Sequence, residues 1–215
     1  MLRILLADDH DIVRRGLKDL LEQHPGWQVC AEASNGREAV DLALQHRPQV
    51  AVIDLSMPGL NGLDATRRIR QSLPDTEVLI FTMHESEELI REILVAGARG
   101  YLLKSDAVRQ LIPAVESLSH GKPFFAGRVS ELLLDGFLKE GEARVGRPTA
   151  ERLTSREREI VQLLAEGKSN KQIAQLLDLS VKTVETHRTT AMRKLELNSL
   201  ADLVRYAIRT QIIQA

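Results

Sequence analysis

The first half of the chain alternates short apolar runs, rich in branched residues, with amphipathic segments. Five such pairs follow one another: 3–7 with 12–23, 27–33 with 36–45, 50–54 with 62–71, 77–82 with 86–97, and 100–104 with 108–119. The short runs are typical of buried strands, and the longer segments have the three- to four-residue apolar spacing of helices. Five strand-then-helix units predict a doubly wound α/β fold, with a five-stranded parallel sheet and helices on both of its faces.

This pattern stops near residue 120. Residues 121–148 hold GKPFFAG, a possible short helix at SELLLDGFLKE, and GEARVGRP, which together are typical of a linker. Beyond it only helical spacing remains, in the segments 155–167, 170–178, 181–195 and 199–213. We therefore expect an α/β domain over 1–120, a linker over 121–148, and a small all-α four-helix domain over 149–215.

Length and composition agree with a soluble protein of two domains. A chain of 215 residues suits two domains of roughly 100–150 residues or fewer. No apolar run reaches the ~18–20 residues of a membrane-spanning helix, and MLRILLADDHD becomes acidic too soon for a signal peptide. The single cysteine, Cys30, cannot form an internal disulfide. We expect a cytoplasmic protein.

Charge is distributed unevenly along the chain. The formal net charge is −1, but residues 1–146 carry 17 Lys and Arg against 22 Asp and Glu, a net −5. Residues 147–215 carry 12 against 8, a net +4. A basic C-terminal domain indicates an anionic partner such as nucleic acid.

Acidic residues follow two of the predicted strands. Asp8 and Asp9 come after the first apolar run, and Asp54 ends the third. In open parallel sheets the ligand site lies at the carboxyl ends of the strands, and three carboxylates at one point need a hard cation such as Mg²⁺. Thr82 and Lys104 end the fourth and fifth runs, where a hydroxyl and an ammonium could bind a phosphoryl group. Each acid taken alone could instead be a helix cap or a solvated turn residue.

The segments ILLADDH, VIDLSMPGLNGL, LIFT and GARGYLLKS resemble the receiver domain of two-component response regulators, which has a flavodoxin-like fold. The resemblance covers residues 1 to about 120. It implies that Asp54 is the nucleophile that takes a phosphoryl group from a sensor histidine kinase. It implies that Mg²⁺ binds to Asp9, Asp54 and the backbone carbonyl of Ser56, with Asp8 acting through water. Thr82 and Lys104 match the catalytic and switch hydroxyl and the phosphate-pairing lysine.

Several residues near this site have two interpretations. The resemblance makes Tyr101 the aromatic residue of the switch, although a strand tyrosine is commonly a packing residue. His10 and His84 flank the site, and we interpret them as loop residues that tune access rather than as metal ligands. The resemblance also implies a cis peptide between Lys104 and Ser105, which costs ~3–4 kcal/mol outside proline.

Within the helical domain, SNKQIAQLLDLSVKTVETHRTTAMRKL reads as two helices with a tight break at LDLS. Ser180 is a suitable N-cap for the second helix. Ile173, Ala174, Leu177 and Val184 can pack the two helices together. The outward positions would be those of Lys182, Glu185, Thr186, Arg188 and Thr189. Such a face suits the major groove of DNA, but it also fits an ordinary solvated helix.

The longer string LTSREREIVQLLAEGKSNKQIAQLLDLSVKTVETHRTTAMRKL resembles the LuxR-type helix-turn-helix of the NarL/FixJ response regulators, over about 150–210. The resemblance places Ser169, Asn170 and Lys171 near DNA phosphates, and Thr183, Glu185, Thr186, His187, Arg188 and Thr189 at or near DNA. Arg193 and Lys194 fall toward the phosphate backbone.

These features together predict a response regulator in which phosphorylation of Asp54 controls DNA binding and transcription. The expected partners are a sensor histidine kinase, double-stranded DNA, a second copy of the chain after phosphorylation, and, as a further candidate, RNA polymerase. Two other functions stay open. One is a DNA-binding regulator that signals without phosphate. The other is a Mg²⁺-dependent phosphatase with an aspartyl nucleophile, although no second acid stands two residues after Asp54.

Overall fold

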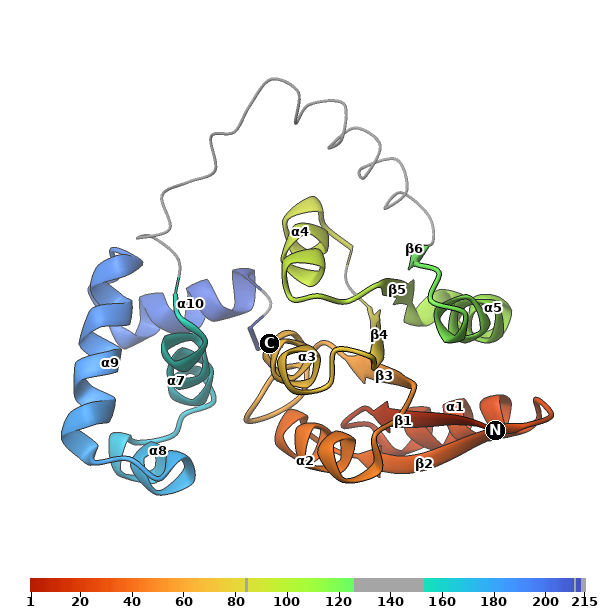
Figure 1. Cartoon of the computed structure of the whole chain (residues 1–215). Coiled ribbons are helices and arrows are strands. Elements are labelled where there is room, and N and C mark those ends of the chain that lie inside the picture. Colours follow the sequence, from red (N-terminus) through yellow and green to blue (C-terminus); the bar gives the residue numbers. More distant parts are fainter. Residues whose placement is uncertain (84, 126–152, 211, 214–215) are drawn as a thin grey trace. The chain divides into compact units, whose positions relative to one another are not determined.

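The computed structural model describes residues 1–83, 85–125, 153–210 and 212–213. They form two compact units (Figure 1). The N-terminal unit has a hydrophobic core on each face of its sheet, and the C-terminal unit has a core of its own. The N-terminal unit contains β1 (Leu2–Ala7), α1 (Asp11–Glu22), β2 (Trp27–Ala33), α2 (Gly36–His46), β3 (Val50–Asp54), α3 (Gly62–Ser72), β4 (Glu77–Thr82), α4 (Glu87–Val95), β5 (Gly100–Leu103), the 3₁₀ turn η1 (Lys104–Asp106), α5 (Ala107–Ser119) and β6 (Phe124–Phe125).

All neighbouring strands pair in parallel, in the order β2-β1-β3-β4-β5-β6. Side chains alternate between the two faces, so Leu5 of β1 belongs to one core and Ile4 to the other. The core on the Leu5 side includes residues of α2, α3 and α4, and the opposite core includes residues of α1 and α5. The predicted doubly wound parallel sheet is confirmed.

Among the described residues the sheet has six strands, one more than the five predicted. β6 consists of Phe124 and Phe125, which pair with Gly100 and Tyr101 of β5. The GKPFFAG segment was interpreted as the start of the linker because two residues cannot show an alternating pattern. The two half-buried aromatic rings pack against the two cores, which stabilises this short edge strand. The expected helix within residues 130–140 lies outside the described residues.

The C-terminal unit is helical in the part that the structure describes. Its helices are α7 (Ser155–Ala165), α8 (Asn170–Leu177), α9 (Val181–Lys194) and α10 (Leu200–Arg209), as the four-helix prediction required. Ser180 accepts a hydrogen bond from the Thr183 amide at 3.0 Å and so caps α9, which confirms its predicted role. The break before α9 turns at Asp178, whose φ of 52° is left-handed.

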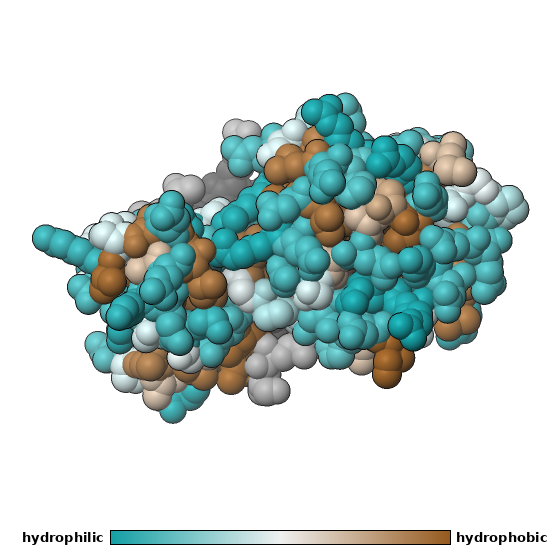
Figure 2. Space-filling model, turned by 90° about the horizontal axis from the view of Figure 1, so that it is seen from below, coloured by the Kyte–Doolittle hydropathy of each residue, from teal (hydrophilic) through white to brown (hydrophobic). Residues whose placement is uncertain are grey.

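The visible face of the molecule is mostly hydrophilic, with hydrophobic residues in separate patches (Figure 2). Among the described residues, none of the helices is both long enough and apolar enough to span a bilayer.

Candidate functional site

The acidic residues converge at the carboxyl ends of β1 and β3, which are neighbours in the sheet. Asp8 directly follows β1, and Asp54 is the last residue of β3. Both side chains are buried, with only 1% and 2% of their surface exposed, whereas Asp9 is exposed. Asp8, Asp9, His10 and Asp54 can each place one ligand atom within 4.8 Å of the others. The sheet thus brings together the three carboxylates that the sequence analysis singled out.

The Lys104 ammonium lies between the two buried carboxylates. Its Nζ is 2.8 Å from Asp8 Oδ2 and 3.0 Å from Asp54 Oδ2. The ammonium therefore forms an ion pair with both buried carboxylates. Burial raises the pKa of Asp54, an effect that Lys104 opposes and Asp8 reinforces. Burial alone would lower the pKa of Lys104, but Asp54 and Asp8 hold it above its usual value.

No cis peptide occurs within the described residues, so the bond from Lys104 to Ser105 is trans and the expectation of a cis bond is wrong here. The trans chain already brings the Lys104 ammonium to both carboxylates. Nothing in the observed contacts therefore requires the less stable isomer.

Thr82 ends β4 and is completely buried. Tyr101 lies on β5, is 1% exposed, and belongs to the same core cluster as Leu89 and Ile93 of α4. Burial, with a contribution from Glu85, raises the pKa of the Tyr101 phenol, so it stays protonated. Tyr101 is therefore packed in the core beside α4, the helix that follows β4 in the chain. His84 lies outside the described residues.

The loop from β3 to α3 is held tightly beside Asp54. A Cβ at Gly62 would lie 2.1 Å from the Asp54 carbonyl oxygen, and the Gly62 amide donates to Leu55 O at 2.8 Å. Sequence reasoning did not single out Gly62, although its place in MPGLNG was a turn signal. Ser56, in this loop, is 9% exposed, and its Oγ is buried with no hydrogen-bond partner.

The donor set fits a hard divalent cation. Asp8, Asp9 and Asp54 carry three negative charges, and the Lys104 ammonium balances one of them. The Lys104 ammonium contacts one oxygen of Asp8 and one of Asp54, and the buried Ser56 Oγ has no hydrogen-bond partner. An oxygen-rich set with two uncompensated negative charges suits Mg²⁺.

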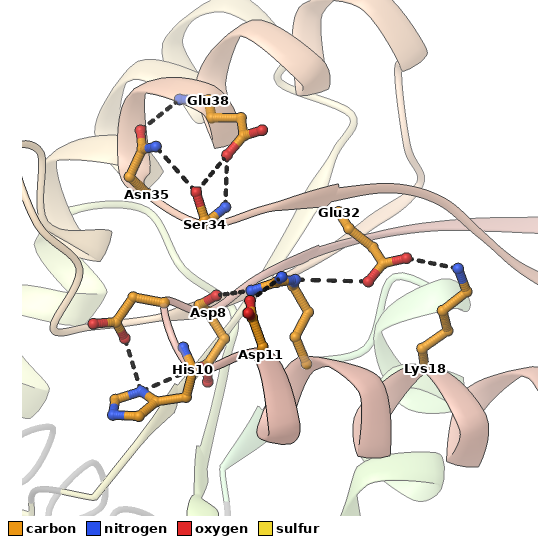
Figure 3. Close-up of polar contacts among 10 residues, drawn as sticks. Asp8, His10, Asp11, Lys18, Glu32, Ser34, Asn35 and Glu38 are labelled. Carbon is orange, nitrogen blue, oxygen red and sulfur yellow. Dashed lines mark hydrogen bonds and ion pairs between the residues drawn. The ribbon is translucent and has the colours of Figure 1, made fainter.

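Two residues beside the acids have contacts that sequence reasoning missed. The His10 ring lies beside Asp8 (Figure 3), with Nδ1 3.3 Å from Asp8 Oδ1. The same nitrogen lies 2.8 Å from Asp9 Oδ1. Arg14, on the next turn of α1, donates to the Asp8 carbonyl at 2.7 Å and pairs with Asp11. Its position in an amphipathic helix gave no indication of this contact.

In the C-terminal unit, α8 and α9 pack through the expected apolar residues. Ile173, Ala174, Leu177 and Val184 are all buried. The DNA-contact candidates on α9 with exposed side chains are Lys182, Glu185, Thr186, Thr189 and Arg193, and those partly exposed are Thr183, His187 and Arg188. On α8 and its cap, Ser169 and Lys171 are exposed and Asn170 is partly exposed. Each of these candidates is therefore at least partly accessible to solvent.

Lys194 differs from the other DNA-contact candidates. Its Nζ lies 2.7 Å from Glu157 Oε2, and its side chain is 21% exposed. Glu157 is buried at 5% side-chain exposure and also takes part in the capping box of α7, through Thr154. Burial alone would raise the pKa of Glu157, but hydrogen bonds from Lys194 and Thr154 hold it below its usual value. The Lys194 charge is therefore engaged within the unit.

Two family models match the chain. That of the response regulator receiver domain matches residues 4–116, and that of the luxR family of bacterial regulatory proteins matches residues 151–207. Oxygen regulatory protein NreC of Staphylococcus epidermidis is 40% identical over 217 residues, which cover 99% of this chain and 100% of NreC. Transcriptional regulatory protein LiaR of Bacillus subtilis is 37% identical over 213 residues, which cover 99% of this chain and 100% of LiaR.

A solved structure with a similar fold is RcsB from Salmonella enterica serovar Typhimurium, bound to promoter rprA in the presence of the phosphomimetic BeF3-. It is 26% identical to this chain, with a TM-score of 0.62, and the match covers 96% of this chain and 98% of RcsB.

Proposed function

The chain belongs to the response regulators that join a receiver domain to a LuxR-family DNA-binding domain, and we propose that Asp54 is its phosphoacceptor. The observation that carries the proposal is the buried carboxylate of Asp54 at a strand end, with the Lys104 ammonium 3.0 Å from its Oδ2. The donor is the phosphohistidine of a sensor kinase. The proposed outcome is control of DNA binding by the second domain.

In the transfer step, an Asp54 carboxylate oxygen attacks phosphorus. The bond from phosphorus to the donor imidazole nitrogen breaks, its electron pair stays on that nitrogen, and the nitrogen takes up a proton. Lys104 is placed to pair with a phosphoryl oxygen, since its ammonium already lies beside the carboxylate that gains the group. The buried hydroxyl of Thr82, at the end of the adjacent strand β4, would donate to another.

Asp9, Asp54 and the Ser56 backbone carbonyl would hold Mg²⁺, with Asp8 acting through a bound water. When bound, the ion supplies positive charge that offsets repulsion among the carboxylates and the incoming phosphoryl group. The Asp8 side chain is fixed for this role because its Oδ1 accepts from the His10 amide at 2.9 Å.

The link to DNA runs through Thr82 and Tyr101. A phosphoryl group on Asp54 would draw the Thr82 hydroxyl toward it, which changes the packing space beside Tyr101 and α4. We propose that this change promotes pairing of two chains. A single helix reads only a few base pairs, so two chains on half-sites about one helical turn apart give the needed specificity.

The test is intact-mass spectrometry of the full chain after incubation with a small phosphodonor and Mg²⁺. Wild type should gain the mass of one phosphoryl group, and Asp54→Asn should gain none. Asp75→Asn is the matched control, because Asp75 is an exposed aspartate in a turn before β4. Phosphorylation of Asp54→Asn at the wild-type level would overturn the assignment.

A further inference from the structure

Arg14 lies in the first turns of α1, close to the turn that carries Asp8 and Asp9. Its amide donates to the His10 carbonyl at 3.0 Å, so the helix fixes where the side chain begins. Its guanidinium donates from Nη1 to the Asp8 carbonyl oxygen at 2.7 Å. Only 16% of the side chain is exposed. A cation buried to this extent is stable because its N–H groups find acceptors inside the protein.

Two carboxylates hold the Arg14 guanidinium in place. Nη2 pairs with Asp11 of the same helix, and Nε lies 3.6 Å from Glu32 Oε2 of β2. Glu32 also accepts from Lys18 Nζ at 2.6 Å, and these contacts are drawn as dashed lines in Figure 3. The planar guanidinium can therefore direct one N–H at the Asp8 carbonyl while its other nitrogens face carboxylates. A single ammonium cannot reproduce this geometry.

The Asp8 carbonyl belongs to the planar peptide that joins Asp8 to Asp9. β1 ends at Ala7, and the Asp8 amide donates to Ala33 O of β2 at 3.1 Å. The hydrogen bond from Arg14 restrains the carbonyl side of the same residue, and with it the plane of the peptide that follows. Rotation of that plane would move the Asp9 carboxylate, which is exposed and therefore depends on its backbone for direction.

We propose that Arg14 is a positioning residue of the metal site, which holds the peptide between Asp8 and Asp9 and so keeps the Asp9 carboxylate directed at the ion. The inference rests on the metal site of the proposed function. Arg14 acts through the backbone of Asp8 and contacts neither the ion nor the phosphoryl group.

Charge and position predict opposite effects when Arg14 is replaced by a neutral residue. Arg14 carries a positive charge close to the acids, so an effect of charge alone would make Mg²⁺ bind more tightly once that charge is removed. Loss of positioning would make Mg²⁺ bind more weakly, because the Asp9 carboxylate is no longer held in place. The direction of the change in affinity therefore separates the two effects.

The experiment is a Mg²⁺ titration of the full chain without phosphodonor, followed by backbone amide NMR resonances. In Arg14→Gln the dissociation constant of Mg²⁺ should rise by about tenfold, on the scale of changes around metal ligands. Arg14→Lys keeps the charge but lacks the planar guanidinium, so it should also bind Mg²⁺ more weakly than wild type.

Arg15→Gln is the matched control. Arg15 is the next residue of α1 and is exposed, and its replacement removes the same charge. This variant should bind Mg²⁺ as wild type does. The proposal is overturned by unchanged or tighter binding in Arg14→Gln, by wild-type binding in Arg14→Lys, or by an equal weakening in Arg15→Gln.

Phosphorylation gives a second readout that a merely structural role would not move. In Arg14→Gln the Mg²⁺ concentration for half-maximal phosphorylation of Asp54 should rise, while the rate at saturating Mg²⁺ should return to near the wild-type level. A lower rate at every Mg²⁺ concentration, with the half-maximal concentration unchanged, would count against positioning. Circular dichroism establishes that each variant is folded, and Arg14→Lys carries the test if Arg14→Gln does not fold.

Failure of this inference differs from failure of the proposed function. If wild type is phosphorylated on Asp54 and the Arg14 variants bind Mg²⁺ as wild type does, the function stands and the role of Arg14 is lost. If the Arg14 variants bind Mg²⁺ more weakly but wild type is not phosphorylated on Asp54, the proposed function is lost while the role of Arg14 stands.

Discussion

Lys194 and Arg193 are adjacent basic residues at the end of α9, but the structure predicts different consequences when each is replaced. Lys194 pairs with the buried Glu157, whereas Arg193 is exposed. Lys194→Met would leave the Glu157 carboxylate with only its Thr154 partners, because the 2.7 Å ion pair is lost. We expect Lys194→Met to make the C-terminal unit less stable. The salt dependence of its DNA binding should stay largely unchanged.

The size of the loss follows from the burial of the pair. Removing one partner of a fully buried pair costs about 3–5 kcal/mol, and an exposed pair contributes about 0.2–1 kcal/mol. Lys194 is 21% exposed and Glu157 keeps its capping hydrogen bonds, so an intermediate loss of about 1–3 kcal/mol is expected. Each kcal/mol lowers the Tm of a domain of this size by about 4–8 °C.

The pH dependence has a definite sign. The pKa of Glu157 is lowered in the folded state, so the stability that it contributes is fully present above its unfolded value of 4.5. That contribution is lost as the pH falls through the lower folded pKa. Lys194→Met should therefore flatten the acid limb of the stability profile.

Two measurements are made on residues 149–215: thermal unfolding, and a salt titration of DNA binding. This segment is suitable because the hydrophobic core of the C-terminal unit is formed by its own residues. Arg193→Met is the control: stability should change by no more than about 0.5 kcal/mol, and the log-log salt slope should fall by about 0.9. The reasoning is refuted if Lys194→Met unfolds like Arg193→Met and loses a similar part of the salt slope.

Three further outcomes are expected from the two units. Lys104→Ala should leave basal DNA binding intact but remove the gain in DNA affinity that phosphodonor causes in wild type. A normal gain in a gel-shift assay would contradict the phosphate-pairing role of Lys104. EDTA should abolish phosphorylation of Asp54 until a divalent ion is restored, as measured by intact-mass spectrometry. Phosphorylation at the full rate in EDTA would refute the metal requirement. Residues 149–215 alone should bind DNA weakly and with strong salt dependence, and Arg188→Ala should weaken that binding further. The proposed contact surface would be excluded if the affinity did not depend on salt, or if Arg188→Ala bound as tightly as wild type.

The α/β unit could be predicted because β1, β3, β4 and β5 are largely buried on both faces and its strands alternate with amphipathic helices. The same periodicity located Asp8, Asp54 and Lys104 at strand ends, and parallel pairing brings such ends together. β6 escaped prediction because the pairing of Phe124 and Phe125 depends on a neighbouring strand and not on local pattern.

Contacts made by polar side chains across elements were harder to foresee. Lys194 looks like any basic residue at a helix end, and its partner Glu157 is 37 positions away. The contact between Gly62 and the Asp54 carbonyl, and the turn that carries His10 onto the acids, also depend on how the loops fold over the sheet. Residue type suggested the chemistry, but three-dimensional packing decides which groups meet.

The central claim is that phosphorylation of Asp54 controls DNA binding, and one titration tests it most directly. The full chain is titrated onto a paired site, selected from random DNA by the phosphodonor-treated protein, with and without phosphodonor at fixed salt. Wild type should bind more tightly after phosphodonor treatment, and Asp54→Asn should bind equally under both conditions. Equal affinity of wild type under both conditions, or a matching gain in Asp54→Asn, would contradict the claim and favour a regulator that signals without phosphate.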